Sequence, residues 1–143
     1  ALWPVKRVIF DSDLYIDWIK AGRRGELLLA RPLVRYMSTV VLLELQAGAL
    51  ERTAALAVRD LYRTFHRVGR LVSPSPETFW RAGSALRTLQ QRYGFDLRRR
   101  FRLVNDCLIA LSSRQIGAIV LTRNERDFRL IQQVAPFSLV VVP

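Results

Sequence analysis

The sequence predicts an α/β protein in which helices cover both faces of a parallel sheet. Short apolar runs of strand length alternate with longer segments whose apolar residues recur at helical spacing. The strand runs are apolar throughout instead of alternating with polar residues, which is typical of strands that are buried on both faces. No internal repeat, low-complexity tract or linker divides the 143 residues, so we expect one domain over residues 1–143.

The first third of the chain is expected to contain two strands and three helices. The strands are expected at Val5–Phe10 and Leu33–Met37, and the helices from Ser12 or Asp13 onward, at Glu26–Ala30, and from a cap at Ser38–Thr39 to Gly48. The side chains of Ser, Thr and Asp accept hydrogen bonds from the free N–H groups of a first helical turn, which is why these residues mark the helix starts.

The remaining two thirds repeat the alternation of helix and strand. Helices are expected at Glu51–His66, Glu77–Tyr93, Leu103–Gln115 and Glu125–Val134, and strands at Arg70–Val72, Ala118–Leu121 and Ser138–Val142. The span Gly94–Arg102 is expected to be a basic loop with Phe101 buried beneath it. We expect the tryptophans, Trp3, Trp18 and Trp80, to be core or interface anchors, because their large rings favour burial.

Composition argues against a disordered chain and against a membrane protein, and it fits a reducing compartment. Half of the residues are apolar, which argues against disorder. No apolar run approaches the roughly 20 residues that cross a bilayer, so we expect no membrane association. The single cysteine, Cys107, cannot form an internal disulfide, which fits a reducing cytoplasm.

The net charge of +11 comes almost wholly from arginine. Of 23 Lys and Arg residues only Lys6 and Lys20 are lysine, which leaves 21 arginines. A guanidinium presents a planar fork of donors that matches phosphate, so nucleic acid is the expected partner. A genome whose base composition favours arginine codons would give the same bias without a polyanionic partner.

Three acidic residues fall where their neighbours predict burial. Asp11 ends the first apolar strand, Glu44 lies in the helical stripe of Val40, Leu43 and Ala47, and Asp106 lies in that of Leu103, Cys107, Ala110 and Leu111. An isolated buried carboxylate costs several kcal/mol. Any one of these acids could pair with an arginine, whereas three together favour a shared divalent cation.

The position of Asp11 also predicts where such a site would lie. Ligands of open parallel sheets bind beyond the carboxyl ends of the strands, so Asp11 and residues 122–127, which follow another strand, should share one edge. Mg²⁺ or Mn²⁺ suits an all-oxygen set of ligands, whereas one His and one Cys give zinc no softer set. A cation held there can activate water and neutralise charge on a phosphate.

Four segments carry the motifs of a known family. They are Val8-Ile9-Phe10-Asp11-Ser12-Asp13-Leu14, Ser38–Leu45 with Gly48, Asn105–Ala110, and Thr122–Phe128. Their order and spacing, over Val5 to Val142, resemble those of the PIN-domain ribonucleases, and especially of the toxins of VapBC-type toxin–antitoxin systems. The resemblance implies a three-layer α/β/α PIN-like fold with a central parallel sheet of four to five strands.

The resemblance also implies a catalytic site and partners. It implies Mg²⁺- or Mn²⁺-dependent RNA cleavage, with Asp11, Glu44 and Asp106 as the first three acids of the family's cluster. The fourth position falls on Asn124, where many members carry Asp, and this departure puts a second metal in doubt. Asp127 could compensate or be a structural acid, and Asp13 could join the site or cap a helix. By the same resemblance the protein would be a growth-inhibiting toxin that is silenced by a cognate antitoxin. An apolar surface on the first helices or on the Glu51–His66 helix would suit a homodimer, since closed homodimers are common.

Six arginines are candidate contacts for RNA phosphates. They are Arg98, Arg99, Arg100 and Arg102, which lead into the helix of Asp106, and Arg123 and Arg126, which flank Asn124. Such contacts are salt-sensitive and largely independent of base sequence. The alternative for the first four is a solvated loop.

Two rival functions remain at this stage. Phe10-Asp11-Ser12-Asp13 resembles the strand-ending Asp-x-Asp of haloacid-dehalogenase-type phosphatases, but the chain has no Lys beyond Lys20 and no later acidic pair where Thr122–Asn124 stands. The other rival is a non-catalytic or RNA-processing PIN-domain protein that binds RNA, which the uncharged Asn124 would favour.

Overall fold

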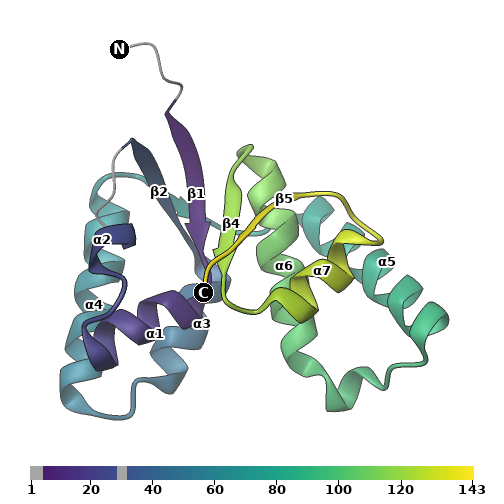
Figure 1. Ribbon diagram of the computed structural model, residues 1–143, viewed down its shortest axis with the longest axis horizontal. Helices are drawn as coiled ribbons and strands as arrows, with labels where there is room; N and C mark the ends of the chain where they lie inside the picture. Colours follow the sequence, from purple (N-terminus) through teal and green to yellow (C-terminus); the bar gives the residue numbers. More distant parts are fainter. Residues whose placement is uncertain (1–4, 29–31) are drawn as a thin grey trace.

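The computed structural model describes residues 5–28 and 32–143 and contains a five-stranded parallel sheet (Figure 1). The strands lie in the order β3-β2-β1-β4-β5, and their bounds are Lys6–Phe10 (β1), Leu33–Ser38 (β2), Leu71–Val72 (β3), Ile119–Thr122 (β4) and Ser138–Val141 (β5). Every neighbouring pair is parallel. The sheet thus confirms the predicted strand number and direction.

Helices cover both faces of this sheet. They are α1 (Ser12–Ala21), α2 (Gly25–Leu28), α3 (Thr39–Gly48), α4 (Arg52–Arg67), α5 (Pro76–Tyr93), α6 (Phe101–Gln115) and α7 (Glu125–Gln132), with a 3₁₀ turn, η1, at Leu97–Arg99. Figure 1 shows α1 to α4 on one side of the strands and α5 to α7 on the other. The expected three-layer α/β/α architecture is therefore present.

The register of β1 and β4 places the carboxyl ends of these central strands side by side. Phe10 pairs with Leu121, and the next N–H, that of Asp11, donates to the Leu121 carbonyl at 2.9 Å. Ile9 and Val120 are fully buried, as expected of strands covered on both faces. Asp11 and Thr122 consequently leave the sheet at the same edge.

Two helix caps fix the chain next to this edge. The Ser38 hydroxyl accepts from the N–H groups of Val40 and Val41, as predicted. The prediction that Ser12 or Asp13 caps α1 is wrong, because Asp11 itself is the cap and accepts from the Ser12 N–H. Ser12 and Asp13 already lie in the first turn of the helix.

The expected face of α3 is also wrong. Leu43 is 62% exposed and Ala47 is exposed, whereas Val40, Val41 and Leu45 are buried. The helix is apolar almost all round, so its sequence does not single out one face. Glu44 nevertheless lies half-buried, and the stripe of α6 around Asp106 is buried as predicted.

Further differences concern segment ends and aromatic residues. Most boundaries shift by one or two residues; of the helix expected at Glu26–Ala30, Leu29 and Ala30 lie outside the described residues. The basic span 94–102 is not all loop, because it contains η1 and the start of α6. Phe101 is 68% exposed and Trp80 is 79% exposed, so neither is a core residue.

Trp18 is partly exposed, and Trp3 lies outside the described residues. In the part of the chain that the structure describes, no helix has both the length and the apolar character that a membrane span needs.

Candidate active site

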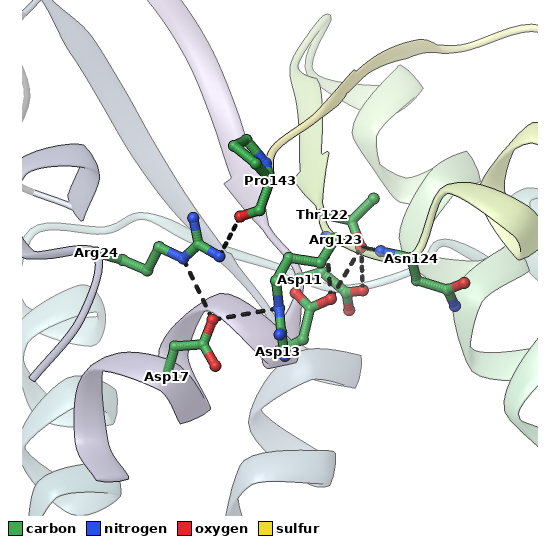
Figure 2. A network of polar contacts seen from close by, with 8 residues as sticks. All are labelled: Asp11, Asp13, Asp17, Arg24, Thr122, Arg123, Asn124 and Pro143. Carbon is green, nitrogen blue, oxygen red and sulfur yellow. Dashed lines mark hydrogen bonds and ion pairs between the residues drawn. The ribbon is translucent and has the colours of Figure 1, made fainter. Parts of the chain in front are cut away.

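Asp11 lies at the centre of the candidate site and is held by two hydrogen bonds. Its Oδ1 accepts from the Ser12 N–H at 2.8 Å, and its Oδ2 accepts from the Thr122 hydroxyl at 2.7 Å (Figure 2). The residue is 5% exposed. Thr122 also accepts from the Asn124 N–H at 2.9 Å, so one hydroxyl links the ends of β1 and β4.

Asp13 binds the segment that follows β4. Its Oδ2 accepts from the Arg123 N–H at 3.0 Å and from the Thr122 hydroxyl at 3.3 Å. Its other oxygen, Oδ1, is buried and has no hydrogen-bond partner among the described residues. Asp13 therefore adds a fourth carboxylate beside Asp11 and leaves one oxygen available to a ligand.

Asn124 joins the two acids on the other side of the site. Its Nδ2 donates to Asp106 Oδ2 at 3.3 Å and to Asp127 Oδ2 at 3.2 Å. Its Oδ1 accepts from the Asp127 N–H at 3.3 Å and so caps α7. The amide thus keeps two carboxylates close together without adding a negative charge.

Among the acids of the site in the described part of the chain, Asp127 forms an ion pair with an arginine side chain. Its Oδ1 lies 2.8 Å from the Arg100 guanidinium, which also lies 4.5 Å from the centre of the Phe95 ring. Both side chains of this ion pair are largely buried. Arg100 therefore neutralises Asp127 and is the predicted phosphate-binding arginine that lies closest to a cluster acid.

Glu44 approaches the cluster from α3. Hydrogen bonds from Asn105 and Ser12 and the positive charge of Arg102 favour its ionised form, yet burial still raises the pKa of Glu44. Its Oε1 is buried and has no hydrogen-bond partner among the described residues. With Asp13 Oδ1, the site thus contains two buried carboxylate oxygens without a partner, which is costly unless something binds them.

The acids raise one another's pKa. Burial, and then the charge of Asp13, raises the pKa of Asp11 to about 7. Burial, and then the charges of Asp11, Asp127 and Glu44, raises the pKa of Asp106 to about 8, although Arg102 opposes this. These are the effects expected when carboxylates share a poorly solvated site, and a bound cation would relieve both.

The carboxylate oxygens of the cluster could bind Mg²⁺ or Mn²⁺ in an arrangement that is usual for these ions. All donors are oxygens, and two are buried without partners. Within residues 5–28 and 32–143, no three acidic, His or Cys side chains lie close enough together to hold one ion by themselves. Mg²⁺ commonly binds through one or two carboxylates and several waters, so this spacing suits a partly hydrated ion.

The other predicted arginines differ in their placement. Arg98 and Arg99 are strongly exposed and interact with Asp96, away from the acids. Arg102 lies near Glu44 and Asp106, as its effect on the pKa of both acids shows. Arg126 is exposed on α7. Arg98 and Arg99 are therefore not brought to the cluster, whereas Arg100 and Arg102 are.

Arg123 is fixed by an acid that the sequence did not single out. Asp17, on α1, lies 3.2 Å from the Nε of both Arg123 and Arg24, and the Arg24 guanidinium donates to the carbonyl of Pro143 (Figure 2). Arg123 and Pro143 are each more than 100 residues from the partners that they contact here, so only the fold brings them together. Asp17 thus holds a guanidinium beside Asp13 at the rim of the site.

The uncharged Asn124 leads to a testable prediction. Asn124→Asp would replace the donor to Asp106 and Asp127 with a third carboxylate, so we expect the metal-free protein to lose about 1–3 kcal/mol of stability. The same change should tighten Mn²⁺ binding. Thermal unfolding and Mn²⁺ titration measure these two effects.

Asn124→Ala is the matched control, because it removes the hydrogen bonds without adding a charge, and it should not tighten Mn²⁺ binding. Unchanged Mn²⁺ affinity in Asn124→Asp would show that this position does not face a cation.

Comparison with known proteins identifies a family and a shared fold. The family model described as PIN domain matches residues 8–133, and no curated protein sequence matches the chain. Similar solved structures include VapBC-1 from nontypeable Haemophilus influenzae (TM-score 0.68, 20% identity, covering 94% of this chain and 97% of the other).

VapBC2 from Rickettsia felis, bound to a DNA fragment from its promoter, is also similar (TM-score 0.67, 20% identity, 96% and 99% covered), as is VapBC-5 from Mycobacterium tuberculosis (TM-score 0.65, 19% identity, 97% and 100% covered). These identities indicate a shared fold, and the family match covers most of the chain. This protein therefore belongs to the PIN-domain family of nucleases, whose members generally depend on divalent metal ions.

Proposed function

We propose that this protein is an endoribonuclease that hydrolyses RNA phosphodiester bonds with Mg²⁺ or Mn²⁺. The observation that carries the proposal is the buried cluster at the carboxyl edge of the sheet, where burial and neighbouring carboxylates raise the pKa of both Asp11 and Asp106. Such a cluster is costly in the free protein and suits a divalent cation. Its arginine-rich surroundings suit a polyanionic substrate.

Each residue has a distinct role in this proposal. Asp11, Glu44 and Asp106 would bind the cation, one or two of them directly and the rest through its waters. The bound cation would activate water and neutralise charge on the phosphate. The Thr122 hydroxyl orients Asp11, and the Asn124 amide orients Asp106. Both act as positioning residues.

The remaining polar groups bind substrate or support the cluster. Arg100, Arg102 and Arg123 lie at the rim and would bind phosphates on either side of the cut, and Arg126, Arg98 and Arg99 would extend this contact along the strand. Asp127 keeps Arg100 in place through their ion pair, which makes a direct metal contact by Asp127 secondary to this role. Asp13 would contribute its unpartnered oxygen to water around the cation.

The proposed partner is a cognate antitoxin, which would make this protein the toxin of a pair. The similar structures from H. influenzae, R. felis and M. tuberculosis are described as VapBC systems, which supports such a pairing. Two hollows of about 150 and 530 Å³ lie among α1, α3 and α4, and Glu44 lines the smaller. An antitoxin segment placed in the smaller hollow would reach Glu44.

A homodimer is the second proposed assembly. Exposed apolar side chains, Ile16, Trp18, Leu43, Leu56 and Tyr62, lie on α1, α3 and α4 and could be covered by a second copy. Each of these surfaces lies in the layer that also carries Glu44.

The direct test uses purified protein and end-labelled RNA, with DNA of the same sequence for comparison. We expect RNA to be cut only when Mg²⁺ or Mn²⁺ is present, and DNA to remain intact. RNA that is bound but never cut would favour the non-catalytic alternative, in which Asn124 marks a degenerate site. A small antitoxin-like reading frame immediately upstream of the gene would support the toxin role, and its absence would favour RNA processing.

A further inference from the structure

A basic groove lies between α5 and α6, at the far end of α6 from the acids. Two neighbouring hollows of about 190 and 250 Å³ share three lining residues, Arg81, Leu111 and Arg114, and we refer to them together as the groove. Arg114 is eight residues beyond Asp106 on α6, which places it about 12 Å further along the helix. The groove is therefore separate from the candidate active site.

The charge of this groove is positive. Arg81 and Arg114 come from different helices, and the one acid that lines either hollow within the described residues is Glu77. Glu77 lies 2.8 Å from Arg81, but both side chains are more than half exposed, and exposed pairs of this kind contribute little stability. In the described part of the chain, the Arg114 guanidinium has no ion-pair partner, so both arginines are able to bind an anion.

An exposed tryptophan, Trp80, lies on α5 next in sequence to Arg81, which lines the groove. Trp80 is among the most exposed apolar side chains of the described residues and lies one helical turn before Ser84, which lines the larger hollow. Proteins often bind single-stranded RNA with aromatic rings that lie beside arginines. The bases stack on the rings, and the guanidinium groups bind the phosphates. A partner that offers both phosphates and unpaired bases fits this surface better than a protein or a simple anion does.

We propose that this groove is a second RNA-binding site that holds a single-stranded stretch of the substrate away from the cut. The proposal rests on the proposed function, since it concerns the same substrate. Its consequence is a dependence on RNA length: an RNA that reaches both the acids and the groove binds more tightly than one that covers the acids alone. Because phosphate contacts dominate, the added affinity is sensitive to salt.

The test compares a groove variant, Arg81→Ala/Arg114→Ala, with a matched control, Arg63→Ala/Arg67→Ala, which removes the same charge from the exposed face of α4. Affinity is measured by fluorescence anisotropy with chelator present, for a long single-stranded RNA and for a short one. We expect the groove variant to bind the long RNA roughly tenfold more weakly, with a salt dependence lower by about 1.4 in log–log slope, and the short RNA as the wild type does. Trp80→Ala should also weaken long-RNA binding, with the salt slope unchanged.

Three results would overturn the proposal: equal weakening in the control, equal weakening for short and long RNA, or a loss of self-association by light scattering in place of a loss of RNA affinity. Because binding is measured without metal, the outcome is independent of catalysis. A wild type that cuts RNA, with a groove variant that binds like the control, refutes the groove alone. A wild type that binds long RNA through the groove but never cuts refutes the nuclease proposal alone.

Discussion

Asp106→Asn is expected to lower the rate of RNA cleavage by more than about 100-fold, because altering groups that merely support metal ligands already costs 10- to 100-fold. The same change should make the metal-free protein more stable at about pH 8. Asp106 is 6% exposed, and its pKa is raised to about 8 by burial and then by Asp11, Asp127 and Glu44. An amide of the same shape avoids the burial of a charge and the repulsion from the neighbouring acids, and its oxygen can still accept a hydrogen bond from Asn124.

The expected gain is at least about 1.4 kcal/mol, the free energy that corresponds to a change of one in pKa, or roughly 4 °C in the unfolding midpoint. Cleavage assays and thermal unfolding measure the two effects on the same preparation. Asp60→Asn is the control, because Asp60 is an exposed acid on α4 whose loss should alter neither property. An Asp106→Asn protein that is less stable and still cuts RNA would contradict the assignment of Asp106.

Divalent cations are expected to stabilise the protein strongly at about pH 8.5 and only weakly at about pH 5. The pKa values of Asp11 and Asp106, about 7 and about 8, lie above their ordinary value of 3.8. Between about pH 4 and pH 8 these two carboxyl groups bind more protons in the folded state than in the unfolded state. The free energy of unfolding of the metal-free protein therefore falls as the pH rises through this range. Stability from this source is fully present below about pH 4 and lost as the pH passes 8.

A bound cation reverses this trend, since it needs the ionised carboxylates. At a concentration about 100 times its dissociation constant, Mn²⁺ should add about 2.7 kcal/mol, or roughly 8 °C, at the higher pH. Thermal unfolding across the pH range, with chelator and then with Mn²⁺, measures this. Ca²⁺ and Na⁺ at matched ionic strength separate specific binding from screening. Equal stabilisation at both pH values would mean that the cation binds elsewhere.

The sequence allowed the sheet and two of the central acids to be predicted because their signals are local. Leu103, Cys107 and Ala110 recur at helical spacing, so Asp106 could be placed among buried residues with no knowledge of the fold, and α6 is in fact buried on nearly every side from Asp106 to Ser113. Asp11 ends an apolar strand, and the rule that parallel strands present their carboxyl ends at one edge brought it next to Thr122.

Other features could not be predicted because they depend on tertiary contacts or lack a local signal. α6 begins at Phe101 without a side-chain cap, so nothing in the sequence marks its start. α3 is apolar on nearly every side, which hides its buried face. Asp17 meets Arg123 across more than 100 residues of chain, and Thr122 becomes a positioning residue only because β4 lies beside β1.

The most direct test of the metal-dependent nuclease proposal is a titration of cleavage. Protein stripped with chelator is mixed with labelled RNA, and the rate is followed as Mn²⁺ is added to the wild type and to Asp106→Asn. We predict no cleavage before Mn²⁺ is added, a saturable rise in the wild type, and no rise in the variant at the same concentrations. Cleavage that persists in chelator, or that rises equally in Asp106→Asn, would contradict the proposal that this acidic cluster cuts RNA with a bound cation.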